Sequence, residues 1–175
     1  MSVARTSQFV SFKLEGKLYG LDIRVVTEIH PNVAIVPVPL APPHIRGLVN
    51  IRGQVVLVMD IAVIFGRSPR PVTGKSQIVI LKTSSEIRKV RGLPDEFEPE
   101  SFGNKAIGFL VDRIGDVVTV SDRQMRAVPP QIEANNARFI RGVANPDGAF
   151  QVILDAAELI RARVAPENVV PIGGV

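Results

Sequence analysis

Two stretches of this chain are similar to each other, and any fold must accommodate both copies. Residues 45–62 and 140–157 align without gaps at an offset of 95, with identical residues at seven of the 18 positions. Such a repeat indicates that one structural unit occurs twice. The shared turn and cap residues are Gly47, Asn50, Gly53 and Asp60 in the first copy and Gly142, Asn145, Gly148 and Asp155 in the second. Every copy of a hairpin must keep its turn geometry, so folding alone explains these identities.

The first copy has the pattern of a β-hairpin. Gly53, in the turn at 50–53, can adopt the positive φ that a tight turn requires. The apolar, largely β-branched run at 55–58 predicts a strand over 54–59 that is buried on both faces. Asp60 follows this strand directly, and it predicts the N-cap of a short helix over 61–65.

The tips of the two hairpins differ. The first copy has Arg52 at its tip, where the second copy has Asp147. Folding explains the residues that both copies share, but it does not explain this arginine. A guanidinium held at a rigid turn can bind a partner carboxylate through two parallel hydrogen bonds, and arginine is frequent at interface hot spots. An ordinary solvated turn arginine is the alternative interpretation.

A second alignment extends the duplication. Gly20 matches Gly108 at an offset of 88, together with neighbouring residues. Further short strands are predicted at 8–14, 18–23, 78–82 and 106–111. Many short strands separated by turns favour an all-β architecture of small barrels, and the repeat predicts two of them. We therefore expect two barrels that share a core, with a groove for a partner where they meet.

Three segments interrupt this regular pattern. Segment 24–29 fits either a strand or a single helical turn, and the prolines of 30–43 make that passage extended, irregular or a sheet edge. Segment 84–105 contains many charges, two prolines and few apolar residues. It is predicted to be an inserted, mobile surface loop, with a contact to a specific partner as the alternative.

The repeat also predicts how the chain is organised. Two pseudo-repeat units, at about 8–76 and 77–164, are expected to form a single domain. A C-terminal helix is predicted over 155–163, because its apolar residues recur at helical spacing. The tail at 165–175 gives no clear prediction.

The composition favours a globular protein. Hydrophobic residues make up 46% of the chain, but the longest apolar runs are far shorter than the ~20 residues of a membrane span. The N-terminal residues lack the apolar core of a secretory signal and the chain has no cysteine, so a cytoplasmic location is predicted. The net charge is +4, but the arginines are scattered among acids. With one tyrosine and no tryptophan for base stacking, a small nucleic-acid-binding module is a distant alternative.

No motif for catalysis or for metal binding is found in the sequence. The two histidines, His30 and His44, lie beside prolines without obvious partners, and no phosphate-binding glycine loop is found. Asp60 and Asp155 could form a carboxylate pair, but their equivalent positions favour helix capping. We therefore predict an interaction module without catalytic residues, cofactor, metal or small-molecule substrate.

Three segments together resemble the CheW-like adaptor family of bacterial chemotaxis. They are YGLDIRVVTEI (19–29), HIRGLVNIRGQVVLVMDIAVIFG (44–66) and IGFLVDRIGDVV (107–118). The pattern GxxNxRGxxxxxxD, which begins at Gly47, is the most specific part, and the resemblance covers roughly 8–164. It implies two intertwined, five-stranded, SH3-like β-barrels with short helices, including a C-terminal helix, and no catalytic activity.

The resemblance also implies partners. Members of the family couple the cytoplasmic tips of transmembrane chemoreceptors to the histidine kinase CheA, whose regulatory domain is similar to the adaptor. By motif, the implied receptor- and kinase-binding residues are Val26, Glu28 and Arg52, with Ile29, Val111 and Ile114 as neighbours of the receptor-binding surface. The resemblance further implies that the protein associates with the membrane only indirectly, by binding receptors. Its insertion at 84–105 and basic charge depart from compact family members, and an adaptor of a pilus-linked or other non-flagellar pathway is the alternative.

Overall fold

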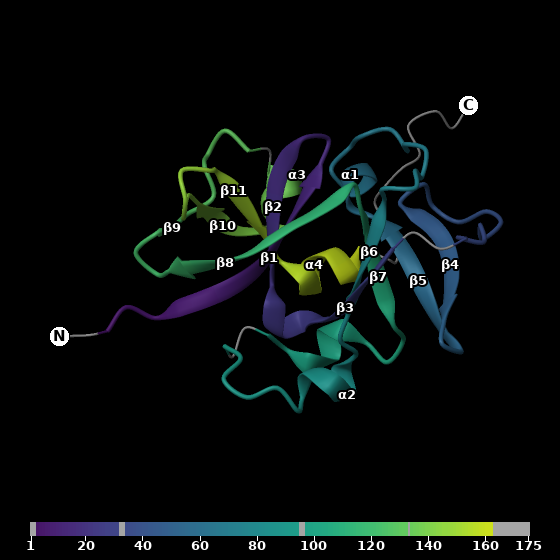
Figure 1. Cartoon of the computed structure of the whole chain (residues 1–175), viewed down its shortest axis with the longest axis horizontal. Helices are drawn as coiled ribbons and strands as arrows, with labels where there is room; N and C mark the ends of the chain where they lie inside the picture. The colour runs from purple at the N-terminus through teal and green to yellow at the C-terminus, as the bar shows by residue number, and fades with distance from the viewer. Residues whose placement is uncertain (1–2, 32–33, 95–96, 133, 163–175) are drawn as a thin grey trace.

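The computed structural model describes residues 3–31, 34–94, 97–132 and 134–162. These residues form eleven strands in two sheets, with a few short helices (Figure 1). In spatial order, the first sheet contains β8 (Arg113–Ser121), β1 (Thr6–Leu14), β2 (Lys17–Asp22), β11 (Gln151–Leu154), β10 (Ile140–Ala144) and β9 (Met125–Arg126). The second contains β3 (Val26–Pro31), β6 (Gln77–Leu81), β7 (Ile107–Val111), β5 (Gln54–Asp60) and β4 (Ile45–Ile51). The predicted all-β fold class is confirmed.

The helices of the described residues are all short. The α-helices are α1 (Ile61–Ile64), α2 (Ser84–Ile87), α3 (Ala134–Ala137) and α4 (Ala156–Arg161), and the 3₁₀ turns are η1 (Ile23–Val25) and η2 (Pro99–Phe102). Segment 24–29, which fitted a strand or a helical turn, contains the end of η1 and then most of β3. The Pro-rich passage 30–43 begins with the last two residues of β3, and Val36 within it forms an isolated bridge to Leu48 on the outer edge of β4.

Each sheet combines strands from both halves of the chain. The order β3-β6-β7-β5-β4 repeats, element by element, the order β8-β1-β2-β11-β10. In each sheet one parallel pair, β5 with β7 or β11 with β2, joins strands that are distant in sequence. The two units are therefore intertwined, as the family resemblance implied. The boundary near residue 76 between the sequence repeats stays a prediction, because neither sheet is built from one repeat alone.

Three apolar clusters stabilise this arrangement. The largest lies between the sheets and includes Leu159 and Ile160 of α4, the helix at the centre of Figure 1. A smaller cluster on the other side of the second sheet contains Val56, Val58 and their neighbours, and a third is formed by the first sheet. Because successive strand residues point to opposite faces, each sheet contributes to the joint core and to a core of its own.

The first hairpin has the predicted geometry. Arg52 and Gly53 have φ values of 51° and 82°, so both central turn residues are in the left-handed region that tight hairpins require. The side chain of Asn50 accepts a hydrogen bond from the Gly53 amide at 2.8 Å. One detail differs from the prediction: Val55 is 57% exposed, because one face of β5 is partly open to solvent.

The two cap residues are also equivalent in structure. Asp60 accepts from the amide of Ala62 at the start of α1, and Asp155 accepts from the amide of Glu158 in α4. Both aspartates have extended backbones, and both lie next to a β-bulge in the paired strand. The predicted capping role is confirmed. Of the predicted C-terminal helix, 156–161 is helical, whereas the tail at 165–175 lies outside the described residues.

Segment 84–105 differs from the expected surface loop. It contains α2 and η2, and it buries Ile87, Phe97 and Phe102 in the joint core. These large side chains cover the cluster from the side of α4, with which η2 is in contact. Sequence patterns did not reveal this anchor, because three apolar residues at irregular spacing among charges match neither the strand nor the helix period.

Candidate functional site

Three of the predicted site residues lie on β3, an edge strand. β3 pairs only with β6, so its outer edge is not paired with another described strand. Val26 and Ile29 are half-buried and pack against the joint core, while Glu28 has 27% of its side chain exposed. The strand therefore presents partly covered apolar side chains together with a carboxylate.

Arg52 reaches the same place from the opposite edge of the sheet. Its Nη2 lies 2.6 Å from Glu28 Oε1 and 2.5 Å from Oε2, although β3 and the β4–β5 hairpin are at opposite ends of the strand order. The second sheet must curl to bring its two edges this close. The structure thus brings together two residues that the sequence had assigned to the site separately.

His30 completes this charged cluster, and sequence reasoning missed its role. Its Nε2 lies 3.1 Å from Glu28 Oε1. The hydrogen bond from Arg52 is the main reason why the pKa of Glu28 lies below its ordinary value of 4.5; burial opposes this shift, and His30 adds a smaller lowering effect. The position of His30, two residues after Glu28 on the same strand face, could have indicated the contact. Glu28 is therefore held as a carboxylate by the Arg52 guanidinium, with the His30 ring beside it.

The remaining two predicted residues have different surroundings. Ile114, at the start of β8, is half-buried against the joint core, and its amide donates to Gln77 Oε1 at 2.9 Å. Val111 is fully buried in the joint core. The implied place of Val111 at a binding surface is therefore corrected, because its side chain has no exposed area for a partner to contact.

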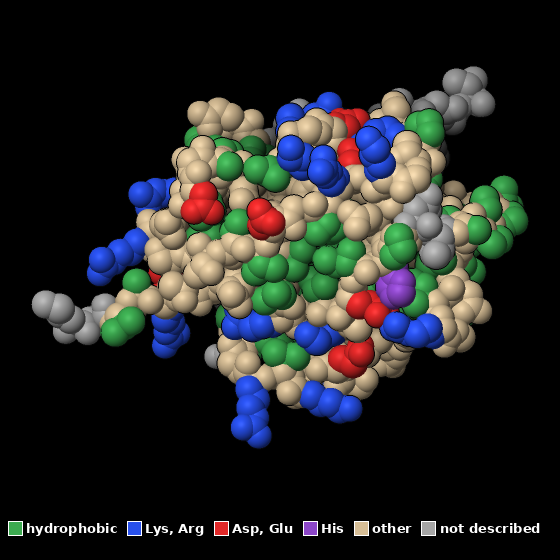
Figure 2. Space-filling view, in the orientation of Figure 1, with side chains coloured by type: hydrophobic (Ala, Val, Ile, Leu, Met, Phe, Trp, Pro, Cys, Tyr) green, Lys and Arg blue, Asp and Glu red, His purple; other side chains and the backbone are tan. Residues whose placement is uncertain are grey.

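The residues of β3 and β8 contribute to one face of the molecule. On the side shown in Figure 2, hydrophobic side chains form a central patch, with Lys and Arg side chains above it and a histidine beside acidic and basic groups below it. We define the apolar patch as Val26, Ile29, Ile114 and Val117, which are half-buried or exposed on the edge strands β3 and β8. Such a surface can bind an apolar protein segment by burial and orient it through charged groups at the rim.

The comparisons with known proteins agree with this architecture. A family model described as the CheW-like domain matches residues 8–164. The chain belongs to the CheW-like family. It is similar to the chemotaxis protein CheW of Treponema pallidum (strain Nichols), with 26% identity over 89% of this chain and 83% of that protein. A second relative, the chemotaxis protein CheW of Rhizobium meliloti (strain 1021), is 25% identical over 85% of this chain and 83% of its own length.

A solved structure shows the same fold. The crystal structure of the scaffolding protein TtCheW from Thermoanaerobacter tengcongensis matches this CheW-like chain with a TM-score of 0.66. The two are 26% identical, and the match covers 89% of this chain and 87% of that one. Like other members of this scaffold family, the chain has the SH3-like β architecture.

The described residues contain neither a membrane-spanning helix nor a cluster of metal-binding side chains. No helix among them combines the length and the hydropathy needed to cross a membrane. In the same part of the chain, no group of three or more histidine, aspartate or glutamate side chains is arranged to hold a metal ion.

Proposed function

We propose that this CheW-like protein is a non-enzymatic cytoplasmic scaffold that couples transmembrane chemoreceptors to a CheA-type histidine kinase within a chemosensory array. Membership of the family and the names of the relatives support this role. The protein reaches the membrane only through the receptors it binds. The kinase contributes its regulatory domain, which resembles this domain.

The observation that carries the proposal is the apolar patch with the Glu28–Arg52–His30 cluster at its rim. A helical receptor tip covers the patch, and burial of apolar area at about 25 cal/mol per Å² drives the association. Arg52, with 72% of its side chain exposed, remains accessible to a partner while Glu28 holds its guanidinium in place. The cluster fixes the orientation of the bound helix.

Reconstitution with receptor and kinase tests this function. Arg52→Glu places two carboxylates at the rim, so receptor-dependent kinase activation falls at least about tenfold, which corresponds to about 1.4 kcal/mol of coupling. The thermal melt stays within a few degrees of the wild type, because the tip is exposed. Activity is measured as receptor-stimulated phosphate incorporation by the kinase.

The second hairpin offers a matched control. Asp147 holds the equivalent exposed tip position, and Asp147→Lys changes the net charge by two units, as Arg52→Glu does in the opposite direction. This variant is expected to retain full activation. Normal activation by Arg52→Glu, or equal losses in both variants, would contradict the role assigned to the first hairpin.

A further inference from the structure

A recess of about 420 Å³ opens where β3 ends and β6 and β8 begin. It is lined by Pro31, Gly74, Lys75, Ser76, Gln77 and Arg113. Two of these residues carry a positive charge and none is acidic. Lys13 adds a third cation, because it faces Arg113 directly across the β1–β8 pair. We call Lys13, Lys75 and Arg113 the basic site.

The charges of the basic site are not neutralised within the described structure. All three side chains are exposed, and none forms an ion pair with a residue in the described ranges. The nearest acids along the chain are Glu15 and Asp112, and other arginines bind them. Arg70 donates to Asp112, and the Nε of Arg67 lies 3.4 Å from Glu15 Oε2.

The equivalent position in the other sheet shows that folding does not require this concentration of charge. Lys82 and Val25 occupy there the places of Lys13 and Arg113. The Nζ of Lys82 donates to two backbone carbonyls, at 2.7 and 3.3 Å, and Val25 is fully buried. Like charges directly opposite each other on paired strands are destabilising. The pair of Lys13 and Arg113 therefore has an energetic cost that its counterpart avoids.

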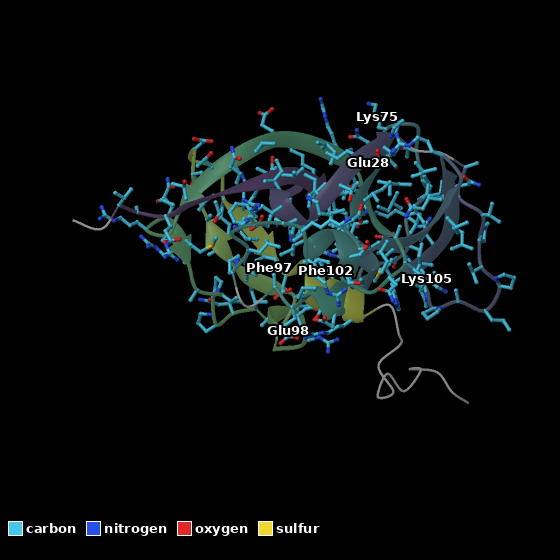
Figure 3. The ribbon with its side chains drawn as sticks, turned by 90° about the horizontal axis from the view of Figure 1, so that it is seen from below. Glu28, Lys75, Phe97, Glu98, Phe102 and Lys105 are labelled. Atoms are coloured by element: carbon cyan, nitrogen blue, oxygen red, sulfur yellow. The ribbon has the colours of Figure 1, made fainter. Side chains whose placement is uncertain are left out.

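The basic site is continuous with the apolar patch. Gln77 lines the recess, and its Oε1 accepts the hydrogen bond from the amide of Ile114 in the patch. Figure 3 places Lys75 and Glu28 on the same side of the molecule and Glu98 on the opposite side. In Figure 2, cationic side chains gather above the hydrophobic patch on the same face of the molecule. A protein that covers the apolar patch therefore also extends over the recess.

From this geometry we infer that Lys13, Lys75 and Arg113 bind an acidic stretch on the receptor segment that covers the apolar patch. The inference rests on the proposed function and adds the chemistry of the partner: glutamate or aspartate side chains beside an apolar helical face. Charge complementarity favours carboxylates, and the neighbouring patch favours a protein over a nucleic acid. The single tyrosine, Tyr19, is stacked between Phe12 and Phe65, so it offers no free platform for bases.

The test uses the full-length chain and a cytoplasmic fragment of a chemoreceptor encoded in the same genome. The variant Lys13→Gln/Lys75→Gln/Arg113→Gln removes the three charges, and Lys89→Gln/Arg91→Gln/Arg123→Gln removes three exposed charges elsewhere. Affinity is measured by isothermal titration calorimetry at about 50 and 200 mM salt, because screening weakens exposed charge pairs over this range. The basic-site variant is expected to bind about tenfold more weakly at low salt and with a smaller salt dependence, while the control stays within about twofold.

The outcomes separate this inference from the proposed function. If the basic-site variant binds like the wild type but Arg52→Glu abolishes binding, the basic site has no role and the coupling function stands. If the wild type does not bind the receptor fragment, both proposals fail. Loss of binding to anionic vesicles or to duplex DNA in the basic-site variant, with receptor binding unchanged, would assign the site to a different class of ligand and overturn the inference.

Discussion

The edge strands β3 and β8 occupy equivalent places in the two sheets, but they carry different chemistry. β3 has Glu28 where β8 has Asp116, and the β4–β5 hairpin has Arg52 at its tip where the β10–β11 hairpin has Asp147. In the first sheet both of these residues, Asp116 and Asp147, are acids, whereas in the second sheet Glu28 is paired with Arg52 at 2.5 Å. One scaffold therefore supports a charged cluster on one side and no equivalent pair on the other.

This difference separates the residues that fold the chain from those available for binding. Glycines, asparagines and aspartates at turns and caps recur in both halves, because both hairpins need the same backbone geometry. The Glu28–Arg52 pair and the basic site occur once each, and neither is required by the equivalent half. Functional residues are best sought at equivalent positions where the two halves have different residue types.

The largest expected effect comes from the two capping aspartates, which differ in what else they bind. Asp60 is fully buried and also accepts from Arg46 Nη1 at 2.9 Å, whereas Asp155 has only its capping bonds in the described structure. Asp60→Ala leaves the largely buried guanidinium of Arg46 without its carboxylate and costs about 3 kcal/mol. Asp155→Ala removes one cap and costs about 1 kcal/mol.

Urea denaturation of both variants measures this difference as a change in midpoint at constant slope. The double variant Arg46→Met/Asp60→Ala provides the control, because it removes the buried charge together with its partner. It is expected to recover part of the loss. Equal costs for the two single substitutions would show that the two caps are equivalent and that the ion pair adds nothing.

A smaller effect on stability is expected at Gly108 in β7 and Gly20 in β2, which occupy equivalent positions in the two sheets. A Cβ on Gly108 would lie 2.4 Å from Cγ2 of Ile78, close to the backbone of the neighbouring strand. A Cβ on Gly20 would lie 2.8 Å from Cδ1 of Ile153, which is the far end of a flexible side chain. Gly108→Ala therefore costs about 2 kcal/mol by overpacking, and Gly20→Ala about half of that.

Thermal melts rank the two glycine variants, since about 1 kcal/mol shifts the melting temperature of a chain of this size by about 2–4 °C. Trimming the neighbour provides the matched test. Ile78→Val keeps Cγ2 and is not expected to rescue Gly108→Ala, whereas Ile153→Val removes Cδ1 and relieves Gly20→Ala. If Gly20→Ala lowers the melting temperature more than Gly108→Ala does, the backbone around Gly108 shifts more easily than the backbone around Gly20 to make room for the added methyl group.

The sequence was sufficient to predict the hairpin turns and the helix starts, but not the side-chain contacts that depend on how far a sheet curls. Turn and cap residues such as Gly53 and Asp155 have local geometric roles, so the hairpins and helix starts were predictable. The contact between Glu28 and Arg52 requires the sheet to curl until its edges meet, and no local pattern encodes that closeness. The burial of Phe97 was missed for the same reason, because its environment comes from α4 and other distant elements.

The smallest expected effect is the pH dependence of the Glu28–Arg52 contact. Because the folded-state pKa of Glu28 lies below its ordinary 4.5, ionised Glu28 stabilises the fold above about pH 4.5, and this contribution is lost as the pH falls through the lower folded-state value. Carboxyl-detected NMR titration of Glu28 is expected to give a midpoint below 4.5 in the wild type and a higher midpoint in Arg52→Ala. Glu100, whose pKa is lowered by its hydrogen bond from Arg88, is the internal reference, and Arg52→Ala should leave its midpoint unchanged. A Glu28 midpoint that does not respond to loss of Arg52 would show that the pair does not persist in solution, and the two edge strands would then differ in sequence alone.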